Sequence, residues 1–203
     1  MEPLKTIATP AIPLALANVD TDQLIPARFM KRPRAAGYGP FLLHDLRESA
    51  VARGGVDPLG DPRHAGAAIL VARRNFGSGS SREAAVYALA DFGLRCIVAP
   101  SFGDIFASNA VKNGMLPARV AEADAEALLA SLALIEGRGV AIDLAAQTIA
   151  VGNLVVSFAI DPVWKTQLMN GWDDIDLTLA ETPAIARFRA ADANLRPWAR
   201  LPG

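Results

Sequence analysis

A loop rich in glycine and serine, placed between two short apolar runs, most limits the possible folds of this sequence. Residues 67–72 form a continuous apolar run, as in a strand that is covered on both faces, and residues 95–99, which are apolar after Arg95, are predicted as another buried strand. Residues 75–81 between them read NFGSGSS, and residues 82–92 show the spacing of a helix that ends at Gly93. Parallel strands joined by a helix are connected right-handedly. The sequence therefore predicts this loop at the carboxyl end of a strand and at the start of a helix.

The rest of the chain predicts a single mixed α/β domain over residues 1–203. The first sixty-five residues show little periodicity and are predicted as loops and short strands. Beyond residue 100 we expect a helix from Ser101, its N-cap, to residues 113–114; a strand over 116–120; a helix over 122–135; strands over 140–144, 149–151 and 154–160 with a tight turn at 152–153; and helices over 162–170 and 177–191. The late strands alternate apolar and polar residues, which indicates antiparallel strands buried on one face.

The inventory of metal ligands is small. One cysteine cannot form an internal disulfide, hold an iron–sulfur cluster or build a structural zinc site. Cys96 stands in an apolar run and is predicted to be a small buried side chain. His44 and His64 lack metal-ligand spacing, so surface or hydrogen-bonding roles are expected. We predict no metal bound by this chain.

Charge and hydropathy argue against further classes of protein, namely membrane, secreted and nucleic-acid-binding proteins. No run of eighteen apolar residues is present and the first residues lack the pattern of a signal peptide, so a cytoplasmic protein without membrane contact is expected. A net charge of −1 and 6% aromatic residues argue against nucleic-acid binding. The one basic stretch, residues 28–34, carries Arg28, Lys31, Arg32 and Arg34 without an acid. It is either a solvated loop or an anion-binding loop, since arginine binds carboxylates in a bidentate manner.

The glycine-serine loop carries groups that could take part in chemistry, namely Ser80, Ser81 and Arg82. Backbone N–H groups, two hydroxyls, a guanidinium and a helix N-terminus together favour an anion. The segment matches neither a Walker A loop nor a dinucleotide-binding fingerprint. In one interpretation Ser81 merely caps the helix. In the other, the same donors stabilise a serine alkoxide that could remove a proton beside a carboxylate.

Five segments together resemble the small subunits of 3-isopropylmalate dehydratases, the swivel domains of the aconitase superfamily. They are residues 18–29 (NVDTDQLIPARF), 75–83 (NFGSGSSRE), 99–106 (APSFGDIF), 113–117 (NGMLP) and 169–171 (MNG). Taken alone, the first segment favours an ordinary Asx-turn over a site. The five in this order span nearly the whole chain.

The resemblance implies a swivelling β/β/α domain of mixed parallel and antiparallel strands that docks on a separate large subunit. In such enzymes the large subunit holds a [4Fe–4S] cluster through three cysteines, and its open iron accepts the substrate hydroxyl. No cofactor is expected on this chain. The implied reaction is the isomerisation of 2-isopropylmalate and 3-isopropylmalate, small dicarboxylates of leucine biosynthesis, by dehydration and rehydration.

The match also implies residue roles. Ser80 is expected to be the catalytic base, supported by Ser81, while Arg82 binds a substrate carboxylate and Arg28 provides a second contact. The further expected substrate-binding residues are Thr21 and Gly79, and the possible substrate loop contributes Lys31, Arg32 and Arg34.

Two departures from the family pattern leave alternatives open. Ala84 stands where many relatives have a histidine, and the basic loop lacks the threonines of many bacterial relatives. A related hydratase acting on citraconate or another alkyl-malate is one alternative. A non-catalytic regulatory module with the same fold is another, and nucleic-acid binding through residues 28–34 is a third.

Overall fold

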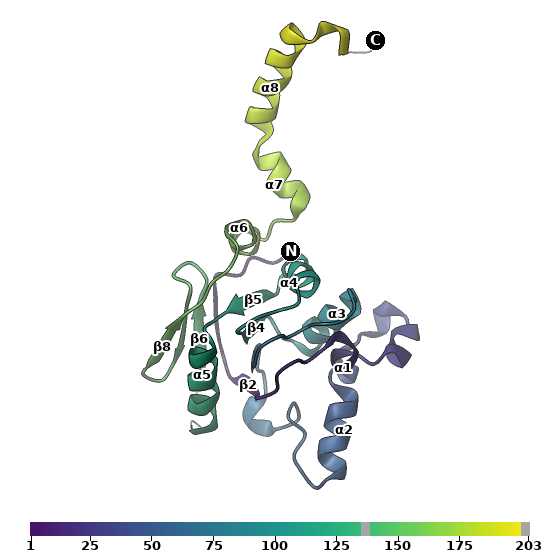
Figure 1. Cartoon of the computed structure of the whole chain (residues 1–203), viewed down its shortest axis with the longest axis vertical. Coiled ribbons are helices and arrows are strands. Elements are labelled where there is room, and N and C mark those ends of the chain that lie inside the picture. The colour runs from purple at the N-terminus through teal and green to yellow at the C-terminus, as the bar shows by residue number, and fades with distance from the viewer. Residues whose placement is uncertain (135–138, 200–203) are drawn as a thin grey trace.

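The computed structural model describes residues 1–134 and 139–199 and contains two four-stranded sheets (Figure 1). The strands are β1 (Thr6–Thr9), β2 (Ala11–Leu14), β3 (Ile69–Ala72), β4 (Cys96–Ala99), β5 (Leu116–Arg119), β6 (Val140–Asp143), β7 (Thr148–Val151) and β8 (Leu154–Ser157). The α-helices are α1 (Thr21–Leu24), α2 (His44–Ala52), α3 (Glu83–Phe92), α4 (Asp104–Lys112), α5 (Glu122–Leu134), α6 (Pro162–Asn170), α7 (Asp174–Ala180) and α8 (Thr182–Leu195). Short 3-10 turns are η1 (Ala27–Lys31), η2 (Arg34–Ala36), η3 (Gly39–Phe41), η4 (Pro62–His64) and η5 (Pro197–Ala199).

The parallel sheet has the strand order β2-β3-β4-β5 and confirms the predicted strand–loop–helix–strand unit. Successive side chains of a strand point to opposite faces, and β3 is buried on both of its faces. Leu70 and Ala72 belong to the hydrophobic core with α3, whereas Ile69 and Val71 belong to the core shared with the second sheet. A strand buried on both faces requires the continuous apolar run that residues 67–72 show.

The second sheet is antiparallel, with the order β1-β6-β7-β8, as the alternating pattern predicts. Its buried positions, such as Ile142 paired with Ile149, face the parallel sheet and α5. The β7–β8 hairpin turns at residues 152–153, as predicted. One antiparallel and one parallel sheet with helices on them give the mixed α/β class that the sequence predicts.

Several local predictions are wrong. The helix α2 lies in the region predicted as loops and short strands; its N-cap is Leu43, which has a positive φ and no capping side chain. Ser101 does not cap α4, because the N-cap is Gly103 and Ser101 Oγ accepts a hydrogen bond from the Asn75 backbone N–H. The strand predicted over 154–160 ends at Ser157. Ile135, predicted at the end of α5, lies outside the described residues.

The C-terminal helix predicted over 177–191 is two helices, α7 and α8, which meet at Glu181. Residues 174–199, here called the C-terminal arm, project away from the rest of the molecule (Figure 1). No residue of α7 or α8 is buried. Among the described residues, none of the helices combines the length and apolar character needed to cross a membrane.

Cys96 is fully buried in β4, as predicted, and burial raises the pKa of its thiol. A thiol reacts as the thiolate, so native Cys96 should react only when the fold opens. For a domain with a stability of at least about 5 kcal/mol, the reaction with a disulfide reagent should be more than about a thousandfold slower in buffer than in denaturant. Similar rates measured with and without urea would contradict this packing.

Candidate functional site

The glycine-serine loop is held between the two segments that follow the neighbouring strands. On one side the Gly77 N–H donates to Val19 O at 2.7 Å, and the Thr21 N–H donates to Ser78 O at 2.9 Å. On the other side the Phe76 N–H donates to Ser101 O at 3.0 Å, and the Gly103 N–H donates to Phe76 O at 2.9 Å. These bonds continue the pairing of β2, β3 and β4 beyond the strand ends. The loop thus lies at the carboxyl edge of the sheet, as predicted.

Two glycines allow this close approach. Gly77 has φ +71°, and a Cβ atom there would overlap the ring of Phe106, which is itself buried. A Cβ atom on Gly103 would lie 2.6 Å from Gly77 O. Gly79 has φ +94° without a close contact, and the nearest atom to a Cβ placed there would be Thr21 Oγ1 at 3.5 Å. The first two glycines are thus required by packing, whereas Gly79 is required by backbone conformation.

The hydroxyls of Ser80 and Ser81 are exposed at the end of the loop. In the part of the chain that the structure describes, neither Oγ atom makes a hydrogen bond. The backbone of Ser80 is fixed instead: its carbonyl accepts a hydrogen bond from Thr21 Oγ1 at 3.1 Å, and Thr21 is only 1% exposed. The predicted site residue Thr21 therefore contacts the loop and positions the backbone of Ser80.

The helix α3 begins immediately after the two serines. Its N-cap is Arg82, with no capping side chain, so Ser81 does not serve as the cap. The first N–H groups of a helix lack intrahelical acceptors and carry a partial positive charge. The Arg82 guanidinium binds the carboxylate of Asp22, and the contact is made through Nη1. Two hydroxyls, free helix donors and a guanidinium with remaining donors can bind an anion and stabilise a deprotonated oxygen.

Arg28 lies in η1 and binds Asp45 at the start of α2, with a distance of 2.9 Å between Nη1 and Oδ2. Its guanidinium also stacks on the Phe29 ring at 4.5 Å. The contact with Arg28 lowers the pKa of Asp45 to about 2, with a smaller contribution from the hydrogen bond to His44. Asp45 therefore stays ionised at neutral pH, and it holds Arg28 in one place.

Asp22 and Asp45 line the same cavity, of about 660 Å³, between α1 and α2. The other lining side chains include Leu16, Leu46 and Arg53. The carboxylates that bind Arg82 and Arg28 therefore share one cavity wall. Two residues predicted to bind substrate are in this way brought to the same part of the molecule.

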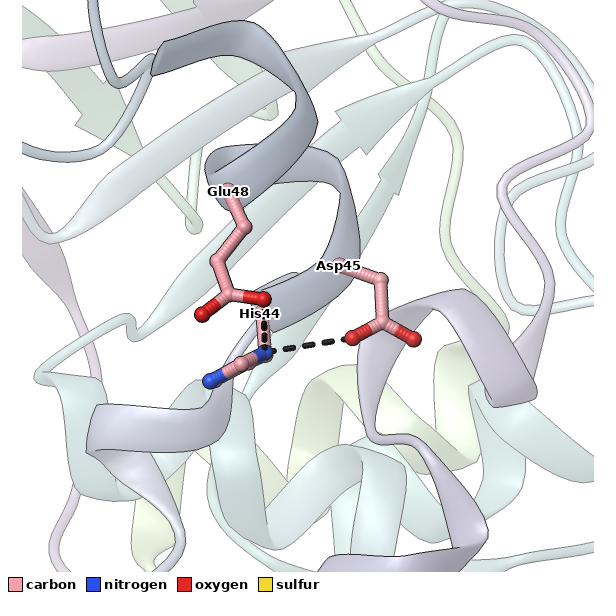
Figure 2. A group of neighbouring side chains, drawn as sticks. All are labelled: His44, Asp45 and Glu48. Carbon is pink, nitrogen blue, oxygen red and sulfur yellow. Dashed lines mark hydrogen bonds and ion pairs between the residues drawn. The ribbon is translucent and has the colours of Figure 1, made fainter. Parts of the chain in front are cut away.

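Figure 2 shows the carboxylates of Asp45 and Glu48 turned toward Nδ1 of His44. Nδ1 lies 3.1 Å from Asp45 Oδ1 and 3.5 Å from Glu48 Oε2. Within residues 1–134 and 139–199 this is the one group of three side chains with suitable atoms for a metal. A guanidinium nitrogen of Arg28 already lies 3.4 Å from Nδ1, so a cation is present beside these carboxylates. His44 has the hydrogen-bonding role that the sequence predicts.

The remaining basic residues of the predicted substrate loop lie elsewhere. Arg34 binds both oxygens of Asp91, at 2.7 and 2.9 Å, and lies over the Tyr87 ring at 4.4 Å. Asp91 is near the end of α3, nine residues or about 13 Å from Arg82 along that helix. Arg32 stacks on Phe41 at 4.8 Å, and Lys31 is exposed. The structure therefore groups Thr21, Gly79, Ser80, Ser81 and Arg82, and it places Arg34 away from them.

Three aspartates at or near the site have no role predicted from the sequence. Asp22 lies inside the first of the five segments, and Asp45 and Asp91 stand in segments without a motif. Each binds one arginine of the predicted set. The excess of arginine over acid in residues 28–34 is the one sequence signal that acidic partners must come from elsewhere in the chain.

Comparisons with known proteins agree with this geometry. The family of aconitase C-terminal domains matches residues 1–123. The 3-isopropylmalate dehydratase small subunit of Teredinibacter turnerae is 42% identical over 196 residues, which cover 92% of this chain and 91% of that protein. The crystal structure of a 3-isopropylmalate dehydratase from Methanocaldococcus jannaschii has a TM-score of 0.66 at 22% identity, covering 90% of this chain and 98% of that one.

The fold and the loop at the sheet edge are those of a protein of the aconitase C-terminal domain family. Within that class, the chain belongs to the family of 3-isopropylmalate dehydratase small subunits. The close relative favours this interpretation over a regulatory module or a different alkyl-malate hydratase.

The packing of Gly77 can be tested against Gly54, which has nearly the same φ (+77°) but would have no atom within 4 Å of an added Cβ. Gly54→Ala should lower the free energy of unfolding by about 1–2 kcal/mol through backbone strain. Gly77→Ala should lower it by a further ~1–3 kcal/mol, because the methyl group meets Phe106. Urea denaturation measures both values. If both variants lose the same free energy of unfolding, the contact with Phe106 does not contribute to the requirement for Gly77.

The ion pair of Arg28 predicts a titration. Because the folded pKa of Asp45 is lowered, the pair stabilises the fold above the ordinary pKa of about 3.9, and this stabilisation is lost as the pH falls through about 2. Arg28→Ala should raise the pKa of Asp45 toward the ordinary value, measured by NMR of the carboxyl carbon. Arg53→Ala, which removes an arginine that lines the same cavity as Asp45, is the control and should leave the pKa of Asp45 unchanged.

Proposed function

We propose that this chain supplies the catalytic base of a 3-isopropylmalate dehydratase, and that it acts with a separate large subunit in the cytoplasm. The single observation that carries the proposal is the Ser80 hydroxyl. It is exposed and unengaged among the described residues, while the backbone that bears it is fixed by Thr21. The name of the close relative supports the reaction, the interconversion of 2-isopropylmalate and 3-isopropylmalate in leucine biosynthesis.

Ser80 removes the proton from the carbon next to a substrate carboxylate. The Ser80 oxygen takes this proton as the carbon–carbon double bond forms and the hydroxyl group departs, so that one water leaves the substrate. In the return reaction a hydroxyl group adds to the neighbouring carbon, and the Ser80 hydroxyl gives the proton back. A serine can serve as a base only if its alkoxide is stabilised. The start of α3 and Arg82, which follow Ser80 closely in the chain, support this role because both carry positive charge.

Arg82 binds one substrate carboxylate, and Ser81 supports Ser80. Arg82 uses Nη1 for Asp22, which leaves its other guanidinium donors for an external carboxylate. The contact with Asp22 also fixes the side chain before the substrate arrives, and this lowers the entropic cost of binding. Arg28 is the candidate for the second carboxylate, because its partner Asp45 lines the same cavity as Asp22.

An iron–sulfur cluster does not fit this chain. Its one cysteine is buried in β4, and burial raises the pKa of that thiol, whereas cluster ligands are thiolates. We therefore propose that the [4Fe–4S] cluster is held by the large subunit. The small subunit then contributes the base and carboxylate-binding groups described above.

The role of Ser80 is tested in the pair reconstituted with the large subunit of the same organism, by following the absorbance of 2-isopropylmaleate. Ser80→Ala should lower kcat by about 10²- to 10⁴-fold, because the base is lost. Arg82→Gln should mainly raise KM. Ser157→Ala, which removes an exposed hydroxyl on β8, is the control and should behave as the wild type.

Size-exclusion chromatography of each variant with the large subunit separates loss of chemistry from loss of assembly. A Ser80→Ala pair that assembles and turns over at the wild-type rate would exclude Ser80 as the base. A wild-type pair that assembles but converts neither isopropylmalate would exclude the proposed reaction.

A further inference from the structure

The C-terminal arm is an apolar surface without a partner in the described part of this chain. Its exposed large side chains are Ile175, Leu179, Phe188, Leu195 and Trp198, with exposed fractions from 61% for Leu179 to 78% for Trp198. Single exposed apolar side chains are normal on a protein surface, but these five all fall within residues 174–199. Exposed apolar side chains that gather in one region mark interaction sites. Phenylalanine and tryptophan are also among the residue types enriched in protein interfaces.

Four of these side chains lie on one face of α7 or of α8, and Trp198 follows in η5. Ile175 and Leu179 are four residues apart in α7, and Phe188 and Leu195 are seven residues apart in α8, so each pair lies on one side of its helix. The opposite side of α8 carries the small side chains Ala186 and Ala190, both exposed. This one-sided pattern is typical of a helix that lies in an apolar groove of another protein.

The arm needs such a groove for its own stability. Isolated helices shorter than about 12–15 residues are marginal in water, and helices in proteins are stabilised by burying an apolar face. The fourteen residues of α8 and the seven of α7 bury no residue against the body of this chain. A partner that covers the arm would supply this missing burial.

The position of the arm indicates which partner covers it. The arm starts at Asp174, which accepts a hydrogen bond from Gln167 Nε2 at 2.9 Å and lies 3.9 Å from Lys112 Nζ at the end of α4. Figure 1 shows the arm leaving the body beside α4 and the N-terminus. The other end of α4, about 13 Å away, packs on the glycine-serine loop through Gly103 and Phe106. A protein that covers Ser80 therefore reaches the root of the arm.

We infer that the C-terminal arm docks in an apolar groove of the large subunit and supplies much of the affinity between the two subunits. This inference rests on the proposed function, which requires a large subunit at Ser80. The loop that faces the substrate is made of glycines, serines and charged side chains, which favour catalysis over tight apolar association. A standard interface buries about 800 Å² on each partner, a size that an arm with five large apolar side chains can provide.

The test compares two double variants of the full chain that place the same charges on opposite sides of α8. Phe188→Glu with Leu195→Glu changes the apolar side, and Ala186→Glu with Ala190→Glu changes the other side. Glutamate is a good helix former, so neither change should unfold the arm by helix propensity. Circular dichroism and thermal melts of both isolated variants confirm that the body is folded.

Binding to the large subunit is measured by biolayer interferometry, and self-association of the chain by sedimentation. The Phe188/Leu195 variant should bind at least about thirtyfold more weakly than the wild type, and the Ala186/Ala190 variant as tightly as the wild type. Equal affinity of the wild type and the Phe188/Leu195 variant would overturn the inference and leave the proposed function intact. The inference would also be overturned if the wild type and the Ala186/Ala190 variant sediment as dimers and the Phe188/Leu195 variant as a monomer, because the arm would then bind a second copy of this chain. A wild-type chain that does not bind the large subunit would overturn both.

Discussion

The parallel pairing of β2, β3 and β4 is the constraint on which the rest of the site depends. Parallel strands all end at the same edge of a sheet, so the segments after these three strands must meet there. They meet as backbone: the glycine-serine loop is hydrogen-bonded to residues 18–21 on one side and 101–103 on the other. The conformation of the Ser80 backbone is thus set by the sheet, and the side chains of the loop are left for chemistry.

The charges around the site form arginine–aspartate pairs that join distant parts of the chain. Asp22 binds Arg82, Asp45 binds Arg28 and Asp91 binds Arg34, so α1, α2 and α3 each contribute a carboxylate. Exposed ion pairs of this kind contribute little to folding stability, typically up to about 1 kcal/mol. Their effect is geometric, since each aspartate limits the positions that a long arginine side chain can take. In the proposed function, a dianionic substrate meets Arg82 and Arg28 with their guanidinium groups already held by Asp22 and Asp45.

The sequence predicts the parts of this structure that follow from local patterns. Continuous apolar runs such as that of β3, the alternation of β6 to β8 and the glycine at the end of α3 each correspond to one local structure, and the structure contains all of them. The helix α2 is not predicted because its N-cap Leu43 has no polar side chain, and local signals for helix starts are polar side chains. The roles of Asp45 and Asp91 are not predicted because they depend on contacts 17 and 57 residues away along the chain. Ser101 is wrongly predicted as a cap because its hydroxyl binds the Asn75 backbone N–H in the neighbouring loop, a contact between strand ends that local patterns do not encode.

The separation of the polar loop from the apolar arm has a physical reason. A surface that binds a dicarboxylate needs exposed hydrogen-bond donors. When a protein surface covers such donors imperfectly, they lose more hydrogen bonds to water than they gain from the protein. Apolar side chains contribute affinity in proportion to the area they bury, without a requirement for precise polar partners. The arm leaves the body at the far end of α4 from the loop, so the two kinds of surface lie close together without overlapping. In the complex that we propose, the large subunit is held at the arm while the contacts at Ser80 remain free to change with the substrate.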